Sequence, residues 1–99
     1  MITFIRTATA MPGKLGDVFA NAKEIAAAWK RVNASDLSIG SAFGGEASEV
    51  AWIVHLGGVS DLDTGLNRLL ADSEYRTVLK KMETLLVPGS ICDRIWRHL

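Results

Sequence analysis

The clearest pattern in this chain is a run of apolar residues at positions 50–56 (VAWIVHL), which two glycines follow directly. β-Branched and aromatic residues dominate the run, and its length suits one strand, so it predicts a buried β-strand. Side chains alternate along a strand, which places Trp52 and Val54 on one face and Ile53 and His55 on the other. Neither face is mainly polar. The pattern therefore predicts that both sides of this strand are covered.

A second pattern predicts an amphipathic helix over residues 14–32, because apolar side chains recur there at three- and four-residue intervals. The apolar stripe consists of Leu15, Val18, Phe19, Ala22, Ile25, Ala26 and Trp29. Before it, residues 2–10 are rich in β-forming side chains and end at Met11-Pro12-Gly13. Proline and glycine together interrupt regular structure, so a first strand is expected to end here.

The segment between the first helix and the central strand predicts another strand over residues 37–45, with Gly44-Gly45-Glu46 as the turn of a hairpin. After the central strand, Ser60 with Asp63 three residues later resembles a capping box and predicts the start of a helix. Asp72-Ser73-Glu74 predicts that the helix restarts. Residues 91–99 follow Pro88-Gly89 and alternate as a last strand would.

The resulting order, β-α-β-β-α-β, predicts one α+β domain over residues 1–99 with a ferredoxin-like antiparallel sheet. In that arrangement the first and third strands are central, and the helices lie on one face of the sheet. Tight hairpins and helical crossovers are the connections that such a topology needs.

The apolar character of both strand faces predicts self-association. Phe4, Trp52, Val54 and Leu56 are the apolar side chains considered for the uncovered side of the sheet. Burying one such side chain stabilises a protein by roughly 1.5–3 kcal/mol. If these four side chains faced water, about 6–12 kcal/mol of stabilising free energy would therefore be lost. That is comparable to the whole net stability of a domain, about 5–15 kcal/mol. We therefore expect a homodimer that pairs through the sheet face. The alternative is a different monomeric fold that encloses the strand.

Composition narrows the possible partners. Eleven basic and eleven acidic residues give a formal net charge of zero, so no electrostatic footprint for nucleic acid is expected. No apolar run is long enough to span a bilayer, and the N-terminus lacks the basic-then-apolar order of a signal peptide. Cys92 is the single cysteine, so an internal disulfide is excluded and a cytoplasmic location is favoured.

Three residues are the candidates for a functional site. Arg6, in a central strand, needs a partner: either an anionic group on a ligand, or Asp93 or a glutamate of a second subunit. Trp52 is expected either to wall a ligand pocket or to pack in the dimer interface. His55 is expected to act either as a general base or as an ordinary hydrogen-bonded side chain at a strand end. His55 and His98 form no metal-binding motif, and no metal or cofactor is expected.

The segments Met11-Pro12-Gly13-Lys14, Asp72-Ser73-Glu74-Tyr75 and Pro88-Gly89 resemble those of the dimeric α+β barrel superfamily, within it NIPSNAP-like and antibiotic-biosynthesis-monooxygenase-like domains. The resemblance implies two sheets paired around a lumen that holds a small organic ligand, which some members oxidise without metal or flavin. Haem-degrading relatives have an Asn, a Trp and a His where this chain has Arg6, Gly58 and Leu79. These differences argue against haem degradation.

These observations lead to three functional hypotheses. The first is a homodimeric module that binds a small apolar or aromatic molecule in the lumen, with Arg6 and Trp52 as ligand contacts. The second is a cofactor-independent monooxygenase or isomerase, with His55 as the base and Arg6 stabilising an oxyanion. The third is a structural dimer with a filled core. Trp52 and His55 alternate onto opposite strand faces, so they cannot both line one lumen without a β-bulge.

Overall fold

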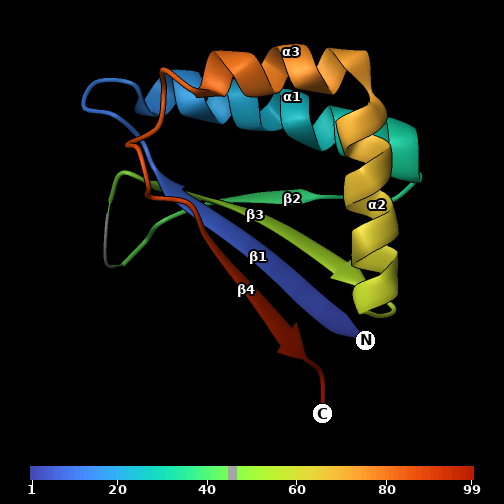
Figure 1. Ribbon diagram of the computed structural model, residues 1–99. Coiled ribbons are helices and arrows are strands. Elements are labelled where there is room, and N and C mark those ends of the chain that lie inside the picture. The colour runs from blue at the N-terminus through green and yellow to red at the C-terminus, as the bar shows by residue number, and fades with distance from the viewer. Residues whose placement is uncertain (45–46) are drawn as a thin grey trace.

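A computed structural model describes residues 1–44 and 47–99 of the chain (Figure 1). Its elements are the strands β1 (Ile2–Thr9), β2 (Ser38–Ser41), β3 (Glu49–Leu56) and β4 (Cys92–Arg97) and the helices α1 (Leu15–Asn33), α2 (Val59–Ala71) and α3 (Ser73–Met82). The strands form one antiparallel sheet in the order β2-β3-β1-β4. The predicted ferredoxin-like α+β architecture, with the first and third strands at the centre, is confirmed.

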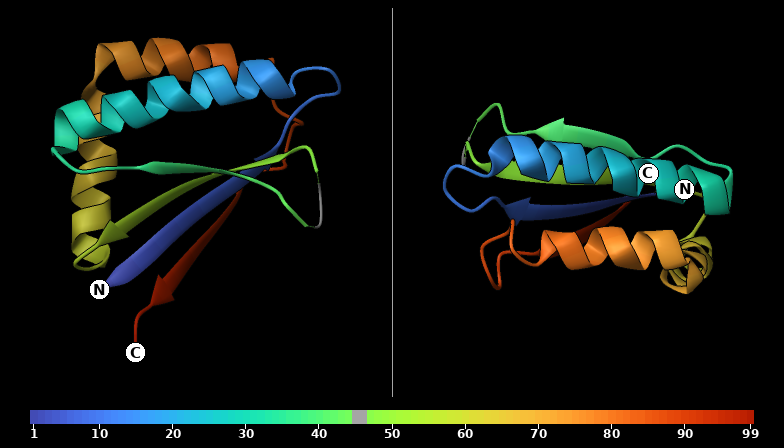
Figure 2. Two further views of the ribbon diagram at one scale, coloured as in Figure 1. Left: turned by 180° about the vertical axis from the view of Figure 1, so that it is seen from behind. Right: turned by 90° about the horizontal axis from the view of Figure 1, so that it is seen from above.

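The helices lie on one face of the sheet. In Figure 2, α1 and α3 run side by side over the strands, whereas α2 crosses one end of the sheet. Among the described residues, no helix lies on the opposite face (Figure 1). The fold therefore has two layers, and the hydrophobic core fills the space between them.

Asp72 divides the second helical region into α2 and α3. Its backbone is extended, with φ −83° and ψ 122°, and its side chain accepts a hydrogen bond from the backbone N–H of Tyr75 at 2.9 Å. This is an N-cap, and it confirms the predicted restart. The predicted capping box at Ser60 was wrong, because α2 begins at Val59 with Gly58 as its N-cap. Ser60 therefore already lies inside the helix.

The edge strands are shorter than the sequence indicated. β2 covers Ser38–Ser41 rather than residues 37–45, and β4 covers Cys92–Arg97 rather than residues 91–99. The predicted turn Gly44-Gly45-Glu46 lies partly outside the described residues. Short edge strands offer fewer unpaired backbone groups to other chains.

The large apolar side chains of the central strands face the helices. In the register of β1 and β3, Phe4 is opposite Val54 and Arg6 is opposite Trp52, which puts all four on the same face. Trp52 is 5% exposed and Val54 2% exposed within a single chain. The prediction that these side chains need a second copy of the chain to become buried was wrong. Both strands carry their bulkiest residues on the same face, and the chain's own helices cover that face.

The face of the sheet that the helices leave open, here called the open face, is formed by the intervening residues. From β1 and β3 it receives Thr3, Ile5, Thr7, Ala51, Ile53 and His55, and from β4 Cys92, Arg94 and Trp96. Ile5 lies directly opposite Ile53, and Trp96 is 58% exposed. This surface is more polar than the buried one, yet its centre and one flank remain apolar.

None of the helices among the described residues has the length and apolarity needed to cross a membrane.

Candidate functional site

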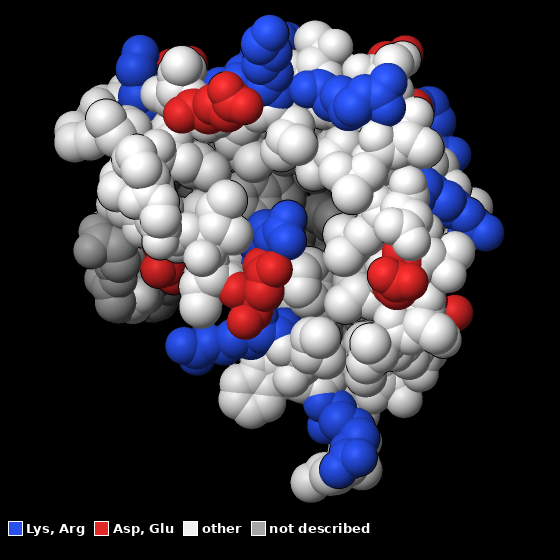
Figure 3. Space-filling model, viewed as in Figure 1, with Lys and Arg blue, Asp and Glu red and all other residues white. Residues whose placement is uncertain are grey.

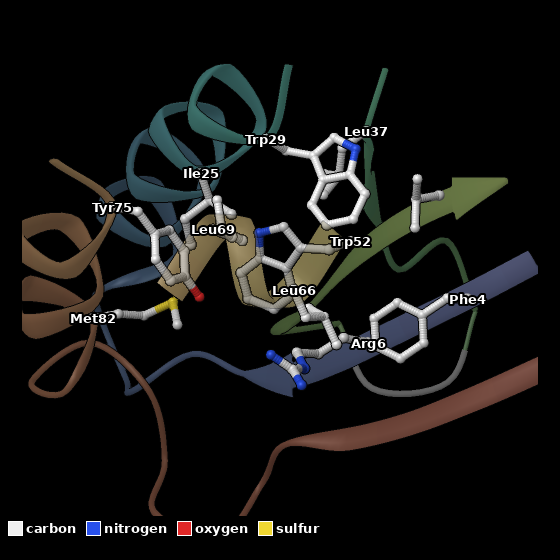
Figure 4. A pocket seen from close by; sticks show the side chains of 11 residues that line it. Phe4, Arg6, Ile25, Trp29, Leu37, Trp52, Leu66, Leu69, Tyr75 and Met82 are labelled. Atoms are coloured by element: carbon white, nitrogen blue, oxygen red, sulfur yellow. The ribbon is translucent and has the colours of Figure 1, made fainter. Parts of the chain in front are cut away.

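A pocket lies between the sheet and the helices, and it opens on the β4 side of the molecule. It is lined by Phe4, Arg6, Ile25, Trp29, Leu37, Trp52, Val54, Leu66, Leu69, Tyr75 and Met82. Figure 3 shows the hollow below the helices, with basic and acidic groups meeting at its mouth. Most of its wall is aliphatic or aromatic (Figure 4).

The pocket exists because the helices do not extend over β4. Every residue of β4 is exposed, including Ile95, which lies on the helix-facing side of the sheet. The volume of the pocket is about 40 Å³, and the hollow measures about 480 Å³ when the open space at its mouth is included.

Arg6 projects from β1 into this pocket and is held by Asp93 of the adjacent strand β4. Arg6 Nε donates to Asp93 Oδ1 at 2.7 Å, and Nη2 donates to Oδ2 at 2.8 Å. The two residues are direct cross-strand partners, so the sheet itself sets this geometry. The ion pair with Asp93 that the sequence offered as one alternative is thus present. The hydrogen bonds from Arg6 also hold the pKa of Asp93 below its usual value.

Trp52 contributes a buried polar atom to the pocket. Its Nε1 is buried and finds no acceptor among the residues that the structure describes. In Figure 4 the indole of Trp52 lies at the centre of the lining residues, between Leu69 and Arg6. An indole N–H can only donate a hydrogen bond. The wall therefore contains an unused donor, which is uncommon for a buried group and a reason to suspect a ligand.

Tyr75 supplies the third polar group, and sequence reasoning did not single it out. The cap at Asp72 fixes Tyr75 in the first turn of α3, and its hydroxyl points toward the Arg6 side of the pocket (Figure 4). Burial raises the pKa of Tyr75, partly opposed by the nearby positive charge of Arg6. The signal that could have identified it was a hydroxyl-bearing residue within the apolar stripe of a helix.

His55 lies on the open face, across the sheet from the pocket. Its Nδ1 is 2.8 Å from Thr3 Oγ1, which also hydrogen-bonds His98 Nε2 at 2.6 Å. The register of β1 and β3 is continuous from Ile2 to Thr9, with no bulge that could turn His55 around. The structure therefore brings Arg6 and Trp52 together and separates His55 from both. Within the described residues, no group of three or more His, Cys, Asp or Glu side chains could hold a metal ion.

The Arg6–Asp93 pair predicts a stability that depends on pH. The pKa of Asp93 is lower in the folded protein than in the unfolded chain, where it is about 3.9. The ion pair therefore contributes fully to stability above the unfolded-state pKa, and this contribution is lost as the pH falls through the folded-state pKa. Both side chains are partly exposed, so the contribution stays within about 1 kcal/mol. Urea unfolding of Asp93→Asn should show lower stability than wild type at pH 7 and a smaller difference below pH 3. An equal difference at both values would contradict this assignment.

The fold and the pocket together define a class: an α+β protein with a ferredoxin-like sheet that carries an apolar pocket under its helices. No family model matches the sequence, and no curated protein matches it. Solved structures do match. A NIPSNAP family protein from Agrobacterium tumefaciens has a TM-score of 0.85 at 17% identity, over 99% of this chain and 92% of that one.

Two further structures agree with this match. A NIPSNAP family protein of unknown function, also from Agrobacterium tumefaciens, has a TM-score of 0.84 at 20% identity and covers 99% of this chain and 87% of its own. An uncharacterised NIPSNAP-like domain protein from Burkholderia xenovorans has a TM-score of 0.82 at 18% identity, with coverages of 99% and 84%. The chain therefore has the NIPSNAP-like α+β fold. This agrees with the resemblance noted in the sequence.

Proposed function

We propose that this protein binds a small, largely apolar molecule in the pocket between its sheet and helices, and that it does so as a homodimer. The pocket lies within one chain, on the helix side of the sheet, rather than between two sheets. Arg6 and Trp52 both line it, as the binding hypothesis requires.

One observation carries the binding proposal: Trp52 Nε1 is buried in an otherwise apolar wall without an acceptor among the described residues. Leaving a buried donor unpaired costs about 1–3 kcal/mol. A site that persists with such a donor is well suited to a ligand that supplies the acceptor. Pockets for small molecules typically combine apolar walls with a few polar groups of this kind.

The dimensions of the pocket indicate how a ligand would be held. The volume of the pocket, about 40 Å³, is smaller than an aromatic ring requires, whereas the hollow including the open space at its mouth measures about 480 Å³. An engineered cavity of about 150 Å³ binds benzene. A ligand of that size would therefore extend from the pocket into its mouth, where the partly exposed side chain of Arg6 lies.

Binding can be tested with the neutral fluorescent probe N-phenyl-1-naphthylamine, whose emission rises in apolar surroundings. We expect saturable binding to wild type. Leu66 lines the pocket from α2, so Leu66→Trp should fill it and weaken binding at least about tenfold, which corresponds to roughly 1.4 kcal/mol.

The matched control is Leu70→Trp, the same substitution on the same helix at a side chain that is 54% exposed. It should leave probe affinity unchanged. If wild type fails to bind the probe, or if both variants bind it as wild type does, the pocket is not a binding site for apolar molecules.

The dimer proposal is supported by the open face. The helices lie on the other side of the sheet (Figure 2), and the open face combines the Ile5–Ile53 pair with Trp96, which is 58% exposed. Exposed apolar patches of this kind usually mark interfaces. Pairing of two open faces about a twofold axis would cover both copies at once.

Sedimentation equilibrium tests the assembly. Wild type should sediment as a dimer, and Trp96→Glu should shift it to monomer, because two carboxylates would be buried in the interface. Leu70→Glu, which changes an equally exposed side chain on α2, is the control and should remain dimeric. A monomeric wild type at all accessible concentrations would rule the homodimer out.

A further inference from the structure

We infer that the ligand of the pocket is a small aromatic or aliphatic acid whose carboxylate takes the place of Asp93 on Arg6. This inference rests on the proposed function, because it names the ligand class for the same pocket. It follows from the kinds of polar groups that the pocket contains and from how Arg6 is held.

The polar groups of the pocket are rich in donors. Arg6 and Trp52 can only donate hydrogen bonds, and the Tyr75 hydroxyl can both donate and accept. No acidic side chain occurs among the described residues that line the pocket. The complementary molecule must therefore supply acceptor oxygens, and the positive charge of Arg6 favours an anion over a neutral acceptor.

The guanidinium of Arg6 is only partly engaged. Asp93 accepts hydrogen bonds from Nε and Nη2, while Nη1 makes none with the described residues. In Figure 4 the guanidinium points into the pocket toward the side where Tyr75 and Met82 lie. The planar fork of arginine matches the two oxygens of a carboxylate. Arg6 can therefore bind the carboxylate of a ligand through Nε and Nη2, the same two donors that now bind Asp93.

Asp93 is the group best placed to give way. It lies on the edge strand β4, and its side chain is 42% exposed, so its carboxylate can turn into water without being buried unpaired. Exposed ion pairs contribute little net stability, which keeps the cost of this exchange small. Asp93 then neutralises Arg6 in the empty protein and competes with the ligand for it.

The apolar part of the pocket wall indicates what the rest of the ligand, apart from its carboxylate, should be. Aromatic and aliphatic side chains such as Phe4, Leu66 and Met82 surround the donors and offer no further polar contacts for a second charged group. Apolar walls exclude strongly hydrated molecules, because their polar groups would lose water without replacement. The geometry therefore favours a monocarboxylate with an apolar body over a sugar or a polyanion.

Benzoate and its neutral isostere benzamide test the inference by titration calorimetry. Wild type should bind benzoate about tenfold more tightly than benzamide, and Arg6→Met should abolish this preference. Asp93→Asn should strengthen benzoate binding about threefold, because the competing carboxylate is gone, and leave benzamide unchanged. If Asp93 instead served to position Arg6 for the ligand, Asp93→Asn would weaken benzoate binding, which would overturn the exchange.

If wild type bound benzoate and benzamide equally, the inference that the ligand is an acid would be rejected, while the proposed binding site for apolar molecules would stand. If wild type bound N-phenyl-1-naphthylamine but neither benzoate nor benzamide, the inference that the ligand is an acid would also be rejected. Failure of all three probes would reject the proposed function itself.

Discussion

Replacing Trp29 with alanine should lower the free energy of unfolding by about 3–5 kcal/mol, the usual range for a fully buried tryptophan. Trp29 is 2% exposed near the C-terminal end of α1, packs against Gly65 of α2, and donates a hydrogen bond from Nε1 to Ser35 Oγ at 2.9 Å. One side chain thus joins the two helices and the loop after α1. Since a domain has about 5–15 kcal/mol in total, the variant should be close to unfolding.

Guanidinium chloride denaturation followed by far-ultraviolet circular dichroism measures this loss. Ser35→Ala serves as the comparison, because it removes only the acceptor of the hydrogen bond and should cost about 1 kcal/mol. If Trp29→Ala costs no more than Ser35→Ala, packing of the indole is not what stabilises this corner of the molecule.

Gly65→Ala should lower the free energy of unfolding by up to about 2 kcal/mol, although alanine is normally the better helix former. A Cβ at position 65 would lie 2.5 Å from Cη2 of Trp29, and this ring is rigid and buried. Overpacking of this kind costs about 1–3 kcal/mol. The gain from helix propensity, about 1 kcal/mol, offsets only part of it.

Gly16→Ala is the matched control, because Gly16 is also helical but has no atom within 4 Å of its added Cβ. It should stabilise the protein by up to about 1 kcal/mol. In a Trp29→Leu background the penalty of Gly65→Ala should shrink, since the ring that causes the clash is absent. The same penalty in both backgrounds would show that Trp29 is not its cause.

The order and type of the elements could be predicted because each has a distinct periodicity. The stripe from Leu15 to Trp29 has the spacing of a helix, and residues 50–56 alternate as a strand does. Proline and glycine separate these segments. Edge strands were less predictable, because β2 and β4 have one neighbour each and their ends depend on pairing rather than on local sequence.

Which face of the sheet the helices cover could not be read from the chain. Alternation sorts Trp52 and Ile53 onto opposite faces but does not say which face is buried. The structure settles this in favour of Trp52, and so places Arg6 in the pocket with it. Asp93 was named as a partner for Arg6, whereas Tyr75 was not singled out, since its place in the pocket depends on the Asp72 cap and on tertiary contacts. The dimer, the ligand and the cytoplasmic location stay predictions.

The position of Asp93 has a consequence for motion. β4 joins the sheet through β1 alone, and all its residues are exposed, so its hydrogen bonds should open more often than those of β1 or β3. The carboxylate that pairs with Arg6 is therefore carried by an edge strand, which should open more readily than the two central strands. Hydrogen exchange at the amides of β4 should report on access to the pocket, and an acid that replaces Asp93 should change exchange there before it affects the rest of the sheet.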